Sequence, residues 1–174
     1  MSVKRLNHAV LYVRNVDRSV QFYEEALGFR VVASFPGAAF LQVPDSHNDH
    51  DLGLFEIGAD AGPSPAGRST VGLYHLAWEV ETLGELQEVG QRLGRMGALA
   101  GASDHGTTKA LYAHDPDGIE FEVSWLVPAE LIDDEVEKAK ATTRPLDLPG
   151  EIAKYGADRP GLRSVVYDPA PRPA

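Results

Sequence analysis

The sequence contains no cysteine. This absence excludes disulfides, thiol nucleophiles, and zinc or iron–sulfur sites built on cysteine ligands. A metal bound to this chain would therefore need histidine, aspartate, glutamate, tyrosine or water as its ligands. The candidate nitrogen ligands are six histidines: His8, His47, His50, His75, His105 and His114.

Long apolar runs and positive charge are also scarce. No apolar run approaches the roughly 18 residues that span a bilayer, and the basic start of the chain, Met1 to Leu6, is not followed by an apolar stretch. We therefore expect no signal peptide, no membrane partner and a cytoplasmic protein. The 16 Lys and Arg residues against 26 Asp and Glu residues give a formal net charge of −10. Such a chain repels phosphate backbones, so nucleic acid is not an expected partner.

What the 174 residues do contain is an order of elements that occurs twice. Each copy is expected to have a strand, a capped helix that ends at glycine, and three further strands. The strands of the first copy are predicted at residues 6–13, 29–34, 38–43 and 52–57, with a helix that Asp17 caps and Gly28 ends. Those of the second are predicted at 72–80, 99–102, 110–113 and 119–125, with a helix from Thr82 to Gly97.

Equivalent residues of the two copies lie 67 positions apart, as His8 and His75 do. The copies form modules at about 5–58 and 72–126, which a Gly- and Pro-rich linker joins, and together they make one domain over residues 1–127. Repeats of this size usually pair, because neither copy buries its apolar face alone. Residues 128–174 are expected to form a C-terminal tail with one short helix, from Pro128 to Lys140, and a frayed end.

Three ligand-type side chains lie opposite apolar strand faces. Because strand side chains alternate, His8 points away from Leu11 and Val13, and His75 and Glu122 are placed in the same way on their own strands. If the two modules pair into one curved sheet, these faces line one concavity. Two imidazoles and a carboxylate are the facial set of non-haem Fe(II) sites. From the residues alone, a metal site and ordinary solvated side chains both remain open.

The chain resembles the vicinal-oxygen-chelate superfamily, which includes glyoxalase I, bleomycin-resistance proteins and type I extradiol dioxygenases. The resemblance covers residues 5 to about 126 and implies an α+β fold, with two βαβββ modules pairing into a curved eight-stranded metal-binding cup. The segments that carry it are Asn7-His8-Ala9, Tyr74-His75-Leu76-Ala77 and Asp115-Pro116-Asp117-Gly118 followed by Glu120-Phe121-Glu122.

Within that superfamily the chain is most similar to small, single-domain, catechol 2,3-dioxygenase-like enzymes. The similar strings are Asp49-His50-Asp51-Leu52, Ser103-Asp104-His105-Gly106 and Leu111-Tyr112. The resemblance implies metal ligation by His8, His75 and Glu122, with Fe(II) as the cofactor and Mn(II) as a metal that the same set accepts. It implies catalytic roles for His50, His105 and Tyr112.

The activity so implied is extradiol cleavage of a catechol-type ring, a reaction of aromatic catabolism, with a small aromatic diol and O2 as partners of a homo-oligomer. His105 or His50 would act as a base when the diol binds. We assign His50 to stabilise charge that develops on oxygen, and Tyr112 to hydrogen-bond a substrate oxygen.

Two other functions fit the same fold. A glyoxalase-type isomerase or lyase would use Glu56 as a fourth protein ligand, and strict alternation would place Glu56 on the same face as His50. A metal-free small-molecule binding or resistance protein would not need the ligand set. Fold alone does not separate these three functions.

Overall fold

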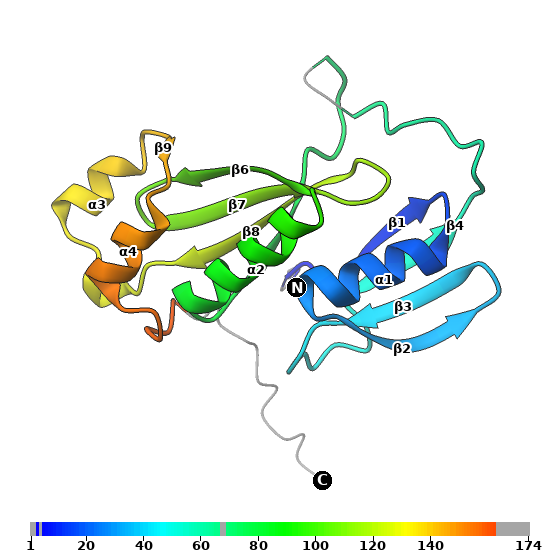
Figure 1. Cartoon of the computed structure of the whole chain (residues 1–174), viewed down its shortest axis with the longest axis horizontal. Helices are drawn as coiled ribbons and strands as arrows, with labels where there is room; N and C mark the ends of the chain where they lie inside the picture. Colours follow the sequence, from blue (N-terminus) through cyan, green and yellow to red (C-terminus); the bar gives the residue numbers. More distant parts are fainter. Residues whose placement is uncertain (1–2, 4, 67–68, 163–174) are drawn as a thin grey trace, which may run out of the picture. The chain divides into compact units, whose positions relative to one another are not determined.

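The computed structural model describes residues 3, 5–66 and 69–162 and shows the βαβββ order twice (Figure 1). The first module is β1 (Ala9–Val13), α1 (Val16–Leu27), β2 (Arg30–Phe35), β3 (Ala38–Gln42) and β4 (Leu52–Glu56). The second module is β5 (Leu76–Glu79), α2 (Leu83–Arg95), β6 (Leu99–Asp104), β7 (Thr108–His114) and β8 (Glu120–Leu126). The predicted α+β class and the repeat are confirmed.

The described residues fall into two compact units. The first contains the residues up to Leu76 together with 91–99 and 113–121, and the second contains 77–90, 100–112 and the residues from Glu122 onward. The first unit therefore holds the whole first module, the end of α2 and the turn before β8. No helix of the described part of the chain is long and apolar enough to cross a bilayer.

The first unit is built on a four-stranded sheet with the order β1-β4-β3-β2. Strand β1 pairs in parallel with β4, and the other neighbours are antiparallel. Helix α1 packs on the sheet and buries Phe22 and Tyr23. The cap prediction was wrong: Asn15 accepts the N–H of Arg18 and begins the helix, while Asp17 lies in its first turn. Gly28 ends α1 in the left-handed conformation, as predicted.

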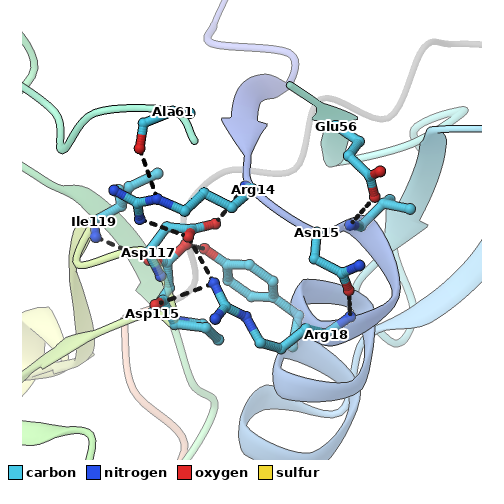
Figure 2. Close-up of polar contacts among 11 residues, drawn as sticks. Arg14, Asn15, Arg18, Glu56, Ala61, Asp115, Asp117 and Ile119 are labelled. Atoms are coloured by element: carbon cyan, nitrogen blue, oxygen red, sulfur yellow. Dashed lines mark hydrogen bonds and ion pairs between the residues drawn. The ribbon is translucent and has the colours of Figure 1, made fainter. Parts of the chain in front are cut away.

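The turn before β8 is fixed within the first unit by polar contacts of Asp115 and Asp117 (Figure 2). Asp117 accepts hydrogen bonds from Arg14 at 2.9 Å and from Arg18 at 2.7 Å. Asp115 accepts the N–H groups of Asp117 and Ile119, which closes the turn that the Asp-Pro-Asp-Gly string predicts. Burial raises the pKa of Asp115 above its ordinary value, although the two N–H donors oppose the change.

The second unit is built on the sheet with the order β5-β8-β7-β6-β9. Helix α2 begins with a capping box, in which Thr82 Oγ1 accepts the Glu85 N–H and Glu85 Oε2 accepts the Thr82 N–H. This confirms the predicted cap. The helix packs on β7 so closely that a Cβ on Gly90 would lie 3.1 Å from Leu111.

The segment after β8 is more regular than the single short helix that the sequence predicts. It contains a 3-10 turn (Ala129–Leu131), α3 (Asp134–Ala139), β9 (Arg144–Pro145) and α4 (Leu148–Tyr155). Helix α4 was missed because Pro149 and Gly150 suggest a break, yet proline is tolerated in a first helical turn and Asp147 caps the Gly150 N–H. The expected frayed end, residues 163–174, lies outside the described residues.

Candidate metal and catalytic residues

His8 lies one residue before β1, on the open face of the first sheet. The predicted alternation of exposed and buried side chains along β1 is confirmed, because Tyr12 is 71% exposed whereas Val13 is 1% exposed. His8 Nδ1 lies 2.7 Å from Asn7 Oδ1. An amide oxygen only accepts, so this bond places the proton on Nδ1 and leaves a lone pair on Nε2. A hydrogen bond of this kind at one ring nitrogen fixes the tautomer in which the other nitrogen can ligate a metal.

His50 lies beside His8 in the first unit. Their ring centroids are 4.5 Å apart, and the His50 ring also contacts Phe40 edge-on at 4.9 Å. Phe40 in turn packs against Phe55 of β4. His50 Nδ1 lies 2.9 Å from a carboxylate oxygen of Asp49. A predicted ligand and a predicted catalytic histidine therefore come together on an aromatic face.

His75 occupies the position before β5 that His8 occupies before β1. The predicted strand began at residue 72, but β5 begins only at Leu76. His75 also belongs to the first unit, where its Nδ1 lies 3.9 Å from Glu120 Oε1 and its ring contacts Tyr74. The equivalence of the two histidines is thus preserved in the structure.

Glu122 belongs to the second unit and lies on β8. Its neighbours Phe121 and Val123 are each 1% exposed, while Glu122 is half-buried, as the alternation predicts. Within residues 3, 5–66 and 69–162, no three histidine, aspartate or glutamate side chains form a metal-binding cluster. The ligands are divided between the two units, so the convergence of His8, His75 and Glu122 stays a prediction.

The catalytic pair predicted in the second module is brought together. His105 Nε2 lies 3.0 Å from the hydroxyl oxygen of Tyr112. The tight turn between β6 and β7 sets this contact, because His105 N–H bonds the Thr108 carbonyl and the Thr107 N–H bonds the His105 carbonyl. Residues seven apart in sequence thereby face each other across a hairpin.

A buried ion pair lies beside His105 and was not predicted. Lys109 Nζ, whose side chain is 3% exposed, lies 2.6 Å from Asp104 Oδ1 and 3.2 Å from Glu151 Oε2. Burial acts to raise the pKa of Asp104, but hydrogen bonds from Lys109 and the Gly106 N–H outweigh it and hold that pKa below 3.8. A lysine beside the apolar Ala110 and Leu111 of β7 was the available signal for this pair.

Glu56 is placed differently from the expectation. Its Oε2 accepts the N–H of Val16 at 2.9 Å, at the start of α1 (Figure 2). Glu56 follows the alternation of the buried Leu52 and Leu54, so it lies on the helix-facing side of the sheet. The expected shared face with His50 was wrong, because β4 begins only at Leu52 and the alternation does not extend back to His50.

The first unit also contains a cavity of about 620 Å³. Its lining includes Val10, Tyr12, Tyr74 and His114. None of the predicted ligands or catalytic residues lines it, although Tyr74 and Glu120, which lie against His75, do.

Comparison with curated proteins gives relatives of two kinds. The chain is 34% identical to biphenyl-2,3-diol 1,2-dioxygenase 3 of Rhodococcus globerulus, over 74% of this chain and 68% of that protein. It is 31% identical to the catechol-2,3-dioxygenase of Bacillus subtilis over 88% of this chain, but spans only 53% of that protein. It is also 30% identical to the lactoylglutathione lyase of Neisseria meningitidis, over 68% of this chain and 88% of that protein.

Comparison with solved structures agrees on the fold. A glyoxylase/bleomycin resistance protein/dioxygenase domain from Frankia sp. EAN1pec matches with a TM-score of 0.59 and 24% identity, over 71% of this chain and 92% of that one. Residues 5–123 match the family described as the Glyoxalase/Bleomycin resistance protein/Dioxygenase superfamily. The repeated βαβββ order and these matches lead to one conclusion: the chain belongs to this superfamily.

Proposed function

We propose that this protein is an extradiol ring-cleavage dioxygenase that acts on a catechol-type aromatic with Fe(II) and O2. The observation that carries the proposal is the 3.0 Å contact between His105 Nε2 and the Tyr112 hydroxyl, which joins a base to a phenol donor. The 34% identity to a biphenyl-diol dioxygenase supports it.

The donor set of this chain suits ferrous iron. His8, His75 and Glu122 would hold the ion, and the bond from His8 to Asn7 already orients one imidazole for that task. When bound, iron would supply Lewis acidity toward a diol and a site for O2.

The remaining steps are assigned to side chains. A catechol must lose a hydroxyl proton as it binds. The Tyr112 oxygen would accept a hydrogen bond from that substrate hydroxyl while its own O–H donates to His105 Nε2, so the released proton would pass through Tyr112 to His105 Nε2. On the aromatic face of the first sheet, the His50 imidazole would donate to oxygen as negative charge develops there. The Phe40 ring beside His50, and the Phe55 ring that packs on Phe40, suit an aromatic guest.

The test is anaerobic loading with Fe(II), removal of free metal, and addition of catechol or 2,3-dihydroxybiphenyl followed by air. We expect O2 uptake equal to the diol consumed and a product that absorbs visible light. Apoprotein and Zn(II)-loaded protein are the controls. Protein that retains iron but consumes no O2 with either diol would refute the proposal.

A glyoxalase-type reaction is the second candidate, because lactoylglutathione lyases are among the relatives. Such an enzyme would need a carboxylate base and a fourth protein ligand. Glu56, the residue considered for that role, accepts the Val16 N–H at the start of α1 instead. Conversion of the methylglyoxal–glutathione adduct by Ni(II)- or Zn(II)-loaded protein, without catechol cleavage by the iron form, would favour this candidate.

A further inference from the structure

The segment after β8 is joined to the hairpin that carries His105. Strand β9 pairs antiparallel with β6, with Asp104 opposite Arg144 and Ser103 opposite Pro145. One step along this ladder places Thr143 across from His105. The two side chains meet there, since Thr143 Oγ1 lies 3.3 Å from His105 Nδ1.

Two further contacts hold the same segment against the hairpin. Gly106, at φ 76°, lies against the end of α3, where an added Cβ would stand 2.5 Å from the Val136 carbonyl oxygen. Lys109 of β7 pairs with Glu151 of α4 and with Asp104. These anchors all lie within the second unit. They fix the backbone on both sides of Thr143, and this fixed backbone holds the Thr143 hydroxyl close to the His105 ring.

The two ring nitrogens of His105 thus have different partners. Nε2 contacts the Tyr112 hydroxyl and Nδ1 contacts Thr143. A neutral imidazole carries one N–H and one lone pair, so a bond at one nitrogen selects the role of the other. With the proton on Nδ1 and donated to Thr143 Oγ1, the Nε2 lone pair faces the phenolic O–H, which is the arrangement a base requires.

We propose that Thr143 is a positioning residue, whose hydroxyl holds the His105 ring in its Nδ1–H form so that Nε2 accepts from Tyr112. The C-terminal segment is then part of the catalytic hairpin rather than a passive extension. The proposal rests on the proposed function, which assigns His105 the role of a base. The contact between Thr143 and His105 can be measured in metal-free protein.

The test compares Thr143→Val, which keeps the shape and removes the hydroxyl, with Thr143→Ser, which restores it. Long-range ¹H–¹⁵N correlation spectra of histidine-labelled apoprotein, recorded at about pH 8 where histidine is neutral, report the tautomer. The His105 signals are identified by their loss in His105→Gln. We expect the Nδ1–H form in the wild type and in Thr143→Ser. The ratio of Nδ1–H to Nε2–H forms should fall about threefold in Thr143→Val.

Thr142→Val is the matched control, because the Thr142 hydroxyl bonds the Ala139 carbonyl at the end of α3 and not His105. It should leave the His105 tautomer unchanged. Thr143→Ala gives a second variant without the hydroxyl if the valine disturbs folding. A wild-type ring in the Nε2–H form, or an unchanged ratio in both hydroxyl-free variants, would overturn the proposal.

The iron-loaded enzyme gives a separate readout. Thr143→Val should lower kcat by about threefold with little change in KM, and Thr143→Ser should restore it. If no variant cleaves any diol while the tautomer ratio changes as expected, the proposed function fails and the Thr143 contact stands. If the enzyme cleaves a diol but the tautomer ratio is unchanged in the variants without the hydroxyl, the Thr143 proposal fails and the proposed function stands.

Discussion

The Tyr23 hydroxyl donates a hydrogen bond to Asp115 Oδ2 across 3.3 Å, inside the first unit. Tyr23 lies on α1 and is 1% exposed, and Asp115 begins the turn before β8. Burial is the largest cause that raises the pKa of Tyr23, and the neighbouring Asp115 charge adds to it. The bond links the first module to the turn that precedes Glu122.

Replacing Tyr23 with Phe keeps the ring and removes this bond. We expect the free energy of unfolding to fall by about 1 kcal/mol, because one buried hydrogen bond is lost and the carboxylate loses a donor. Urea denaturation at neutral pH measures it. Tyr12→Phe is the control, since Tyr12 is 71% exposed and should change nothing. Equal stability of the two variants would contradict the assignment.

Asp104 should make the protein sensitive to acid. Its folded pKa lies below the ordinary 3.8. Because the pKa is lower in the folded protein than in the unfolded chain, the ionised carboxylate stabilises the fold at pH values above the unfolded pKa. This stability is lost as the pH falls through the folded pKa. Asp104→Asn should therefore lower stability at neutral pH and flatten the decline below about pH 4. Urea denaturation across this pH range measures it, and parallel pH curves for variant and wild type would show that Asp104 is not responsible.

Gly106 should tolerate alanine much less well than Gly97 does. Both have positive φ, at 76° and 67°, so each alanine meets the left-handed penalty of about 1 kcal/mol. Only at Gly106 would the new Cβ also strike the α3 backbone, whereas nothing lies within 4 Å at Gly97. We expect a stability loss of more than about 2 kcal/mol for Gly106→Ala. Thermal unfolding of Gly106→Ala and Gly97→Ala measures the two stability losses. Equal losses of stability in the two variants would refute the packing argument.

Substitutions of two glutamates distinguish the dioxygenase-type metal site, which uses Glu122, from the glyoxalase-type site, which would use Glu56. Glu122→Gln should lower retained iron at least about tenfold after desalting, because a ligating carboxylate is lost. Glu56→Gln should retain the iron and lose only about 1 kcal/mol of stability, because Glu56 accepts a hydrogen bond from the Val16 N–H at the start of α1. Metal analysis and thermal unfolding measure these effects. Loss of metal from Glu56→Gln would instead support the glyoxalase-type site.

His105 and Tyr112 should act as one unit in turnover. His105→Gln and Tyr112→Phe should each lower kcat about 10²-fold with iron content unchanged. The double variant should lose little more than either single one, because removal of one partner already disables the pair. Stopped-flow oxygen consumption with catechol measures the rates. Multiplicative losses would show that the 3.0 Å contact has no part in catalysis.

Several local features were predictable because neighbours in sequence decide them. The alternation around β1 placed Leu11 and Val13 in the core, and the capping box at Thr82 follows from a short-range pattern. Catalytic roles for His105 and Tyr112 were expected from resemblance, and the structure brings the two side chains together within one hairpin. The α1 cap was misplaced by two residues, since Asn15 and Asp17 are both good caps and only the chain path selects one.

The sequence by itself determined the repeat, the α+β class and which face of each strand is apolar, because strand and helix periods act over a few residues. Tertiary structure decided what Glu56 and Thr143 do. Glu56 reaches an N–H of α1 that is 40 residues away, and Thr143 meets a ring 38 residues away. No local pattern encodes such pairs, because they depend on sheet order and on the packing of segments remote in sequence.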